Sequence, residues 1–92
     1  MANNSIKILG ELEEEIMEEV WKLGQVSVRD VLSRLAKRKK VAYTTVMTVM
    51  SRLFAKGILK RSLDKSGAFV YLPAKDRQAF MAQASEKIIK KN

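Results

Sequence analysis

Residues 43–57 read YTTVMTVMSRLFAKG, and this segment decides the fold. Its apolar side chains recur at the spacing of an α-helix, and they fall on one side when each residue is rotated by about 100° from the last. They are Val46, Val49, Met50 and Leu53, with Tyr43 and Phe54 on the flank. Because glycine commonly ends a helix, we expect a helix over residues 43–56 that is closed by Gly57.

The opposite face of this expected helix lacks the Glu and Lys that a solvated helix usually presents. It carries Thr44, Thr48, Ser51 and Ala55, bordered by Met47 on one edge and by Thr45 and Arg52 on the other. Threonine is a mediocre helix former, so helix propensity does not explain three threonines here. Hydroxyls can bond to several bases and methyl groups touch thymine, so this face suits the major groove of DNA. The alternative is a helix packed on both sides inside an oligomer.

Two helices are expected before this segment. The first covers residues 9–24, where apolar residues face one side and glutamates the other. Its apolar stripe consists of Leu12, Ile16, Val20 and Leu23, widened by Met17 and Trp21. Ser27 and Asp30 form a capping box for a second helix over residues 28–38. The residues between the two helices, 25–28, are too few for more than a bridge of strand.

A β-hairpin and a last helix are expected after the segment. Residues 58–63 and 68–72 are strand-like runs joined by a turn-forming loop, and a proline ends the second run. Residues 76–90 predict a helix whose apolar stripe is Phe80, Ala84 and Ile88, joined by Met81. Nothing in the first 75 residues obviously needs this stripe, so we expect it to form a partial dimer contact.

The composition excludes most enzyme chemistry. A chain of 92 residues has room for one domain, since two ordinary cores need roughly 150 residues or more. The absence of cysteine and histidine removes thiol nucleophiles, Ser–His and Cys–His pairs, and histidine metal ligands. We therefore expect no catalytic residues, no cofactor and no metal. No apolar stretch approaches the roughly 20 residues of a membrane span, so we expect no membrane partner and a cytoplasmic protein.

Positive charge is concentrated in the middle of the chain. The net charge is +8 overall, and it is −4 over residues 1–28, +9 over 29–65 and +3 over 66–92. Such asymmetry is typical of a protein that places one face on a polyanion, although basicity alone fits a solvated surface equally well. Seven residues lie on or beside the expected helix over residues 43–56, whose outer face suits DNA bases. This position favours contacts of the seven residues with phosphates. They are Lys39, Lys40, Ser51, Arg52, Lys60, Arg61 and Lys65.

Three helices followed by a basic hairpin are the order of a winged helix-turn-helix domain, a mainly α fold with a small β-hairpin. Four blocks in this order resemble the penicillinase-repressor (BlaI/MecI-type) family, which includes the copper-responsive repressors. The blocks are LEEEIMEEVW at 12–21, SVRDV at 27–31, AYTTVMTVMSRL at 42–53 with KG at 56–57, and GAFVYLP at 67–73. The resemblance covers residues 9–75.

This resemblance implies a dimeric bacterial repressor that blocks promoters at palindromic sites with TACA/TGTA-like half-sites. By the same resemblance, Arg52 and the hairpin cations fall on phosphates. The positions that fall where family members touch bases are Thr44, Thr45, Met47 and Thr48. Some family members carry a basic side chain at the position of Met47, whereas Met47 itself offers only apolar contact.

Family members usually continue beyond this length into a helical dimerisation domain, which in antibiotic-sensing members contains the inactivating cleavage site. We therefore expect residues 1–75 to form the DNA-binding domain. Residues 76–92 would be the start of a truncated or reduced dimerisation region. The homodimer of the full family architecture would then be weak or absent in this chain.

Two other functions remain compatible with the pattern. One is a winged-helix protein–protein interaction module, in which the third-helix face packs on a protein. Such a surface would be apolar and charge-balanced, whereas residues 29–65 carry a net charge of +9. The other is non-specific binding to DNA or RNA. Among these, we expect a sequence-specific DNA-binding transcriptional repressor.

Overall fold

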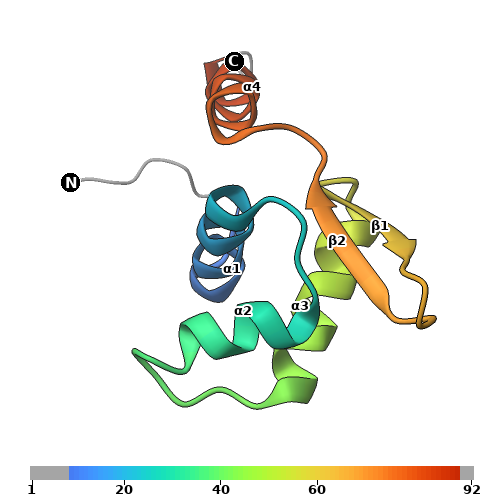
Figure 1. Cartoon of the computed structure of the whole chain (residues 1–92). Coiled ribbons are helices and arrows are strands. Elements are labelled where there is room, and N and C mark those ends of the chain that lie inside the picture. Colours follow the sequence, from blue (N-terminus) through green and yellow to red (C-terminus); the bar gives the residue numbers. More distant parts are fainter. Residues whose placement is uncertain (1–8, 90–92) are drawn as a thin grey trace.

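The computed structural model describes residues 9–89, with side chains described up to Ser85. Its elements are α1 (Glu11–Leu23), α2 (Val28–Leu35), α3 (Tyr43–Ala55), β1 (Leu59–Leu63), β2 (Phe69–Pro73) and α4 (Arg77–Ile89). Figure 1 shows α1, α2 and α3 as one unit, the β1–β2 hairpin (the wing) beside α3, and α4 beyond α1. The predicted fold class, mainly helical with a hairpin wing, is confirmed.

The start of α2 follows its sequence signal. The Ser27 N–H donates to Asp30 Oδ2 at 2.9 Å, and the Asp30 N–H donates to Ser27 Oγ at 3.1 Å. Two backbone N–H groups that the helix leaves without partners are thereby satisfied. The predicted capping box is confirmed.

The end of α2 comes earlier than the sequence predicts. The helix stops at Leu35, and the expected last turn becomes a tighter one, in which the Arg38 N–H donates to the Leu35 carbonyl at 2.9 Å. Residues 37–40 are four consecutive cations, so no apolar side chain anchors another helical turn in the core. The chain then enters α3 through extended backbone at Ala42.

The core lies between the three helices and the base of the wing. Among its buried side chains are Ile16, Met17, Val31, Leu35, Val46, Met50, Leu53, Leu59 and Tyr71. The Val26 N–H donates to the Tyr71 carbonyl at 2.9 Å, and the Tyr71 N–H donates to the Val26 carbonyl at 2.7 Å. This pair confirms the bridge of strand expected before α2, and it ties the wing to the α1–α2 connection.

The sequence shows no obvious partner for the apolar stripe of α4 in the first 75 residues, but α4 packs against α1 of the same chain. The ring centroids of Trp21 and Phe80 lie 5.5 Å apart, and Trp21 Nε1 donates to the Lys75 carbonyl at 2.9 Å. Ala84 is 2% exposed within the single chain. The Ile88 side chain lies outside the described residues. A contact of this stripe with a second subunit stays a prediction.

Replacing Phe80 with alanine is expected to loosen α4 from α1. Trp21 is the only tryptophan, so its fluorescence emission should move to longer wavelength as water reaches the indole. The unfolding free energy should fall by about 1 to 2 kcal/mol, less than for a fully buried phenylalanine, because Phe80 is only half-buried. Gln78→Ala, an exposed position on the same helix, is the control. Identical spectra for wild type and Phe80→Ala would contradict the packing of α4 on Trp21.

A buried carboxylate joins α1 to α2. Glu19 is 2% exposed, and its oxygens accept hydrogen bonds from Arg34 Nε at 3.0 Å and Arg38 Nη1 at 3.2 Å. Burial by itself raises the pKa of the Glu19 carboxyl, but the hydrogen bonds from the two arginines outweigh it and lower the pKa below its usual value. The ionised form of Glu19 is therefore stabilised in the folded chain.

Acid is expected to destabilise the fold partly through Glu19. A carboxyl with a lowered folded pKa contributes stability above its unfolded pKa of about 4.3, and this stability is lost as the pH falls through the folded pKa. Between about pH 5 and pH 3, the unfolding free energy of the wild type should thus fall more steeply than that of Glu19→Gln, which has no such proton to bind. At neutral pH the variant should be less stable by about 1 to 2 kcal/mol. Denaturant titrations at several pH values measure these free energies. If the unfolding free energies of the wild type and Glu19→Gln change in parallel with pH, Glu19 does not contribute to the acid sensitivity of the fold.

Candidate nucleic-acid interface

The outer face of α3 is open to solvent. Thr44, Thr45 and Thr48 are exposed and Met47 is 40% exposed, so all four candidates for base contact lie on the surface. The buried residues of α3 are Val46, Val49, Met50 and Leu53, as the helical spacing predicts. α3 contains no Asp or Glu, so no carboxylate of this helix opposes a phosphate backbone. This face can donate and accept hydrogen bonds at its hydroxyls without losing core packing.

The candidate phosphate contacts on and before α3 differ in their surroundings. Arg52 and Lys40 are exposed, whereas Ser51 is half-buried. Lys39 Nζ pairs with Glu15 Oε1 at 2.7 Å. A phosphate contact by Lys39 would have to compete with this ion pair, whereas Lys40 and Arg52 make no ion pair with another described residue.

The wing presents its cations on two faces. Lys60 and Arg61 are neighbours on β1, and successive residues of a strand point to opposite sides. Lys60 is exposed, whereas Arg61 is half-buried with its guanidinium over the rings of Phe54 and Phe69. The period of the strand is a signal that could have separated these two residues in the sequence. The structure therefore does not bring all seven phosphate candidates to one surface.

A hydrogen-bonded turn shapes the tip of the wing. Asp64 Oδ1 accepts hydrogen bonds from the Ser66 hydroxyl at 2.7 Å and from the Ala68 N–H at 3.0 Å. These bonds hold the pKa of Asp64 below its usual value. Gly67 has φ of +87°, a left-handed conformation that glycine adopts without strain. The turn leaves Lys65 exposed at the tip.

The acidic helix α1 neutralises part of the cationic block. Its ion pairs are Glu13–Lys56, Glu15–Lys39, Glu19–Arg34, Glu19–Arg38 and Glu18–Arg77. Lys40, Arg52, Lys60 and Lys65 are exposed and have no ion-pair partner in the part of the chain that the structure describes. These four cations precede α3, lie on it, or belong to the neighbouring wing (Figure 1). Exposed cations without an ion-pair partner among the described residues therefore border α3, although Lys22, Arg29, Lys37 and Lys75 are exposed and without such a partner as well.

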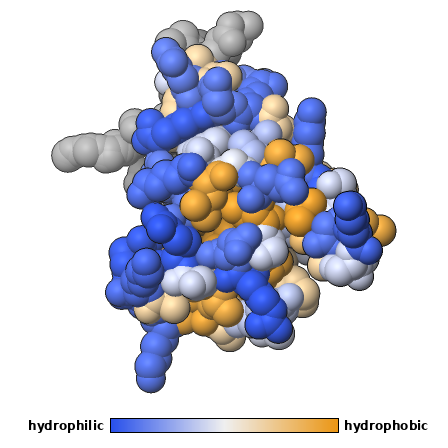
Figure 2. Space-filling view, in the orientation of Figure 1, coloured by the Kyte–Doolittle hydropathy of each residue, from blue (hydrophilic) through white to orange (hydrophobic). Residues whose placement is uncertain are grey.

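Exposed apolar side chains and cation–ring contacts accompany these charges. The exposed large apolar residues are Leu23, Tyr43, Met47, Phe54, Leu63 and Phe69. Figure 2 shows apolar surface over the middle of one face, framed by hydrophilic residues. Arg29 Cζ lies 5.6 Å from the ring centroid of Tyr43, which joins the start of α2 to the start of α3. Sequence reasoning missed this contact because its partners belong to different elements.

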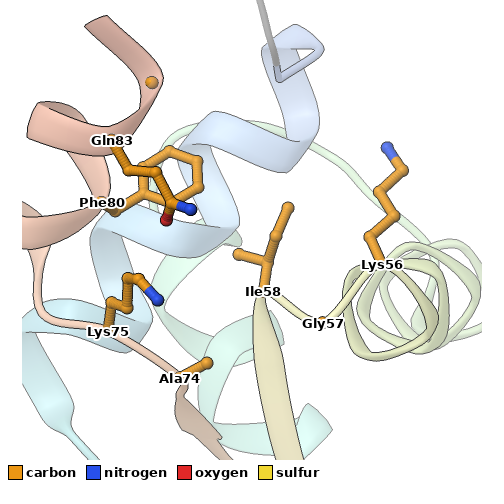
Figure 3. A pocket seen from close by; sticks show the side chains of 8 residues that line it. Lys56, Gly57, Ile58, Ala74, Lys75, Phe80 and Gln83 are labelled. Carbon is orange, nitrogen blue, oxygen red and sulfur yellow. The ribbon is translucent and has the colours of Figure 1, made fainter. Parts of the chain in front are cut away.

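A groove of about 350 Å³ opens between the end of α3, the start of β1 and α4 (Figure 3). Ile58 and Phe80 are among its apolar lining residues, and Lys56 and Lys75 stand on opposite sides. None of the base-contact candidates lines it. Among residues 9–89, no cluster of acidic residues is arranged to hold a metal ion, and no helix is long and apolar enough to cross a membrane.

Comparisons with known proteins agree with this geometry. The model of the penicillinase repressor family matches residues 9–92. The transcriptional regulator BlaI of Mycobacterium tuberculosis is 37% identical over 75 residues, which cover 80% of this chain and 54% of that protein. The penicillinase repressor of Bacillus licheniformis is 28% identical over 82 residues, or 88% of this chain and 62% of that protein. The chain therefore spans about half the length of the curated relatives it matches.

A solved structure matches the fold as well. The solution structure of the DNA-binding domain of the repressor BlaI superimposes with a TM-score of 0.66 and 28% sequence identity. The match covers 82% of this chain and 90% of that domain. The similarity thus extends over nearly the whole DNA-binding domain of that repressor.

Proposed function

The chain belongs to the penicillinase-repressor family, whose members are transcriptional repressors and not enzymes, and we propose that it binds operators with α3 in the major groove and the wing on the phosphate backbone. The observation that carries the proposal is the exposed, acid-free hydroxyl face of α3, bordered by the exposed cations Lys40, Arg52, Lys60 and Lys65, which make no ion pair within the described part of the chain. Base edges need donors, acceptors and methyl contacts, and the backbone needs cations. This face supplies both.

The proposed role of each side chain follows from how exposed it is and whether it makes an ion pair. Base reading is assigned to Thr44, Thr45, Met47 and Thr48. Phosphate contacts are assigned to Lys40, Arg52, Lys60 and Lys65, with the Ser51 hydroxyl as a further donor. Lys39 takes part only if DNA displaces Glu15 from its ammonium group. The Arg61 guanidinium lies against the rings of Phe54 and Phe69, so Arg61 is not assigned to a phosphate.

The operator is proposed to be palindromic with TACA/TGTA-like half-sites, as the family resemblance implies. Two copies of a reading helix fit half-sites about one helical turn, roughly 34 Å, apart on one face of the duplex. We place the DNA-binding domain in residues 1–75 and the start of a dimerisation region in residues 76–92. A repressor of bacterial promoters acts in the cytoplasm, and we propose this location for the chain.

Fluorescence anisotropy with two labelled duplexes tests the proposal. One duplex carries a TACA/TGTA palindrome, and the other carries the same bases in shuffled order. We expect the wild-type chain to prefer the palindrome by about tenfold or more, the ratio that about 1.4 kcal/mol of base contacts provides. Equal affinities at every salt concentration would mean that the chain binds DNA without reading this sequence.

A further inference from the structure

One side chain touches both the reading helix and the second strand of the wing. Arg61 Cζ lies 4.0 Å from the ring centroid of Phe54 on α3 and 4.1 Å from that of Phe69 on β2. The Tyr71 ring centroid, also on β2, is 6.0 Å away. These distances are within the range in which a guanidinium is attracted to an aromatic face.

The strand pattern explains why Arg61 lies there. Arg61 shares a face of β1 with Leu59, which is buried, and it stands directly opposite Tyr71, which is also buried. Phe54 and Phe69 are 38% and 47% exposed. The side chain of Arg61 therefore continues the core outward and covers part of two rings that remain partly exposed. A planar, weakly hydrated guanidinium suits this place better than a lysine ammonium does.

The wing needs such a contact along its outer half. A two-stranded hairpin is marginally stable alone. At its base the wing is held by the Val26–Tyr71 backbone pair and by buried Leu59. Further out, Leu63 is 62% exposed and contributes little burial. Among the described side chains of this outer half, Arg61 is the one with a cation–ring contact to α3, and it also lies over the ring of Phe69 on the facing strand.

We propose that Arg61 is a positioning residue that fixes the wing against α3 and so sets the distance between the base-reading face and the wing cations Lys60 and Lys65. This inference rests on the proposed DNA-binding function. In this role the guanidinium stays between the rings of Phe54 and Phe69 in the complex. It does not bind a phosphate.

The test compares Arg61→Lys with Arg61→Gln, and uses Lys60→Gln, the neighbour on the opposite face, as the control. A positioning role predicts that both Arg61 variants lose affinity for all duplexes by about 3- to 10-fold, because lysine keeps the charge but not the planar stack. Because Lys60 and Lys65 still reach phosphates once the wing is ordered on DNA, the slope of log K against log salt should stay near that of the wild type. Lys60→Gln should lower this slope by about one unit.

A double-mutant cycle with Phe54→Leu identifies the partner. If Arg61 acts through the ring, Arg61→Gln should cost much less affinity in the Phe54→Leu background than in the wild type. If Arg61 instead binds a phosphate, the fold losses in affinity caused by Arg61→Gln and Phe54→Leu should be independent and should multiply in the double variant. Wild-type affinity in Arg61→Lys, together with a one-unit loss of slope in Arg61→Gln, would overturn the proposal and restore Arg61 as a phosphate contact.

A measurement on the free protein separates failure of this inference from failure of the DNA-binding proposal. The Asp64 N–H donates to the Ala68 carbonyl at 2.8 Å and closes the outer end of the wing. Hydrogen exchange at this amide should become faster in both Arg61 variants and stay unchanged in Lys60→Gln. Unchanged exchange in the Arg61 variants would mean that Arg61 does not hold the wing, whether or not the chain binds DNA.

Discussion

Simultaneous replacement of Arg52, Lys60 and Lys65 by glutamine is expected to weaken binding to every duplex by roughly several hundred-fold at about 0.1 M salt. All three side chains are exposed, and none has an ion-pair partner among the described residues. Each cation on a phosphate releases about one counterion, so the slope of log K against log salt should fall by about three units. Anisotropy titrations over a range of salt concentrations measure both quantities.

A control in which two cations are removed elsewhere distinguishes local contacts from net charge. Lys22 and Lys75 are exposed and lie on α1 and just before α4, outside the proposed interface. Replacing both with glutamine should change the slope little. An equal loss of slope per charge in this control and in the triple variant would show that overall charge governs binding, and that the four-cation arrangement around α3 has no special role.

Thr48→Ala is expected to reduce affinity for the preferred duplex by about 1 to 3 kcal/mol, or about 5- to 150-fold, and to leave shuffled-duplex affinity nearly unchanged. Thr48 is exposed at the centre of the outer face of α3, so its hydroxyl and methyl groups can contact a base edge without contributing to the core. The melting temperature should therefore stay close to that of the wild type. Anisotropy with the two duplexes gives the ratio of affinities.

Thr48→Ser is the matched control for this prediction, because it keeps the hydroxyl and removes only the methyl group. If a hydrogen bond from the Thr48 hydroxyl provides the preference for one duplex over the shuffled one, Thr48→Ser should keep much of this preference. If contact with a thymine methyl provides it, Thr48→Ser should keep little. If Thr48→Ala leaves the ratio of preferred to shuffled affinity untouched, α3 does not read sequence. A protein-interaction module would then be the better account of this surface.

Local signals were sufficient to predict the elements of the fold. The apolar spacing around Val46 and Met50 predicts which side of α3 is buried, and the Ser27–Asp30 capping box predicts where α2 begins. Both signals act between residues close in the sequence. α2 ends earlier than the sequence predicts, because helix propensity takes no account of the fact that residues 37–40 have no apolar side chain to bury.

Contacts between distant segments could not be predicted in this way. The partner of Phe80 is Trp21, and the partners of Glu19 are Arg34 and Arg38, and neither set follows from periodicity within one helix. The sequence alone therefore shows no partner for the apolar stripe of α4 within the chain. The candidate site shows the same limit, since the sequence identifies Lys39 as a cation but not its ion pair with Glu15.

Selection of bound duplexes from a randomised pool tests sequence reading by α3 most directly, because it assumes no operator. Wild type and Thr48→Ala are carried through the same rounds at the same salt concentration, and the recovered DNA is sequenced. We predict that the wild type enriches one short motif, and that Thr48→Ala enriches the same motif with one position relaxed. A wild-type chain that retains DNA from the pool but enriches no motif would contradict sequence reading and leave only binding to the phosphate backbone.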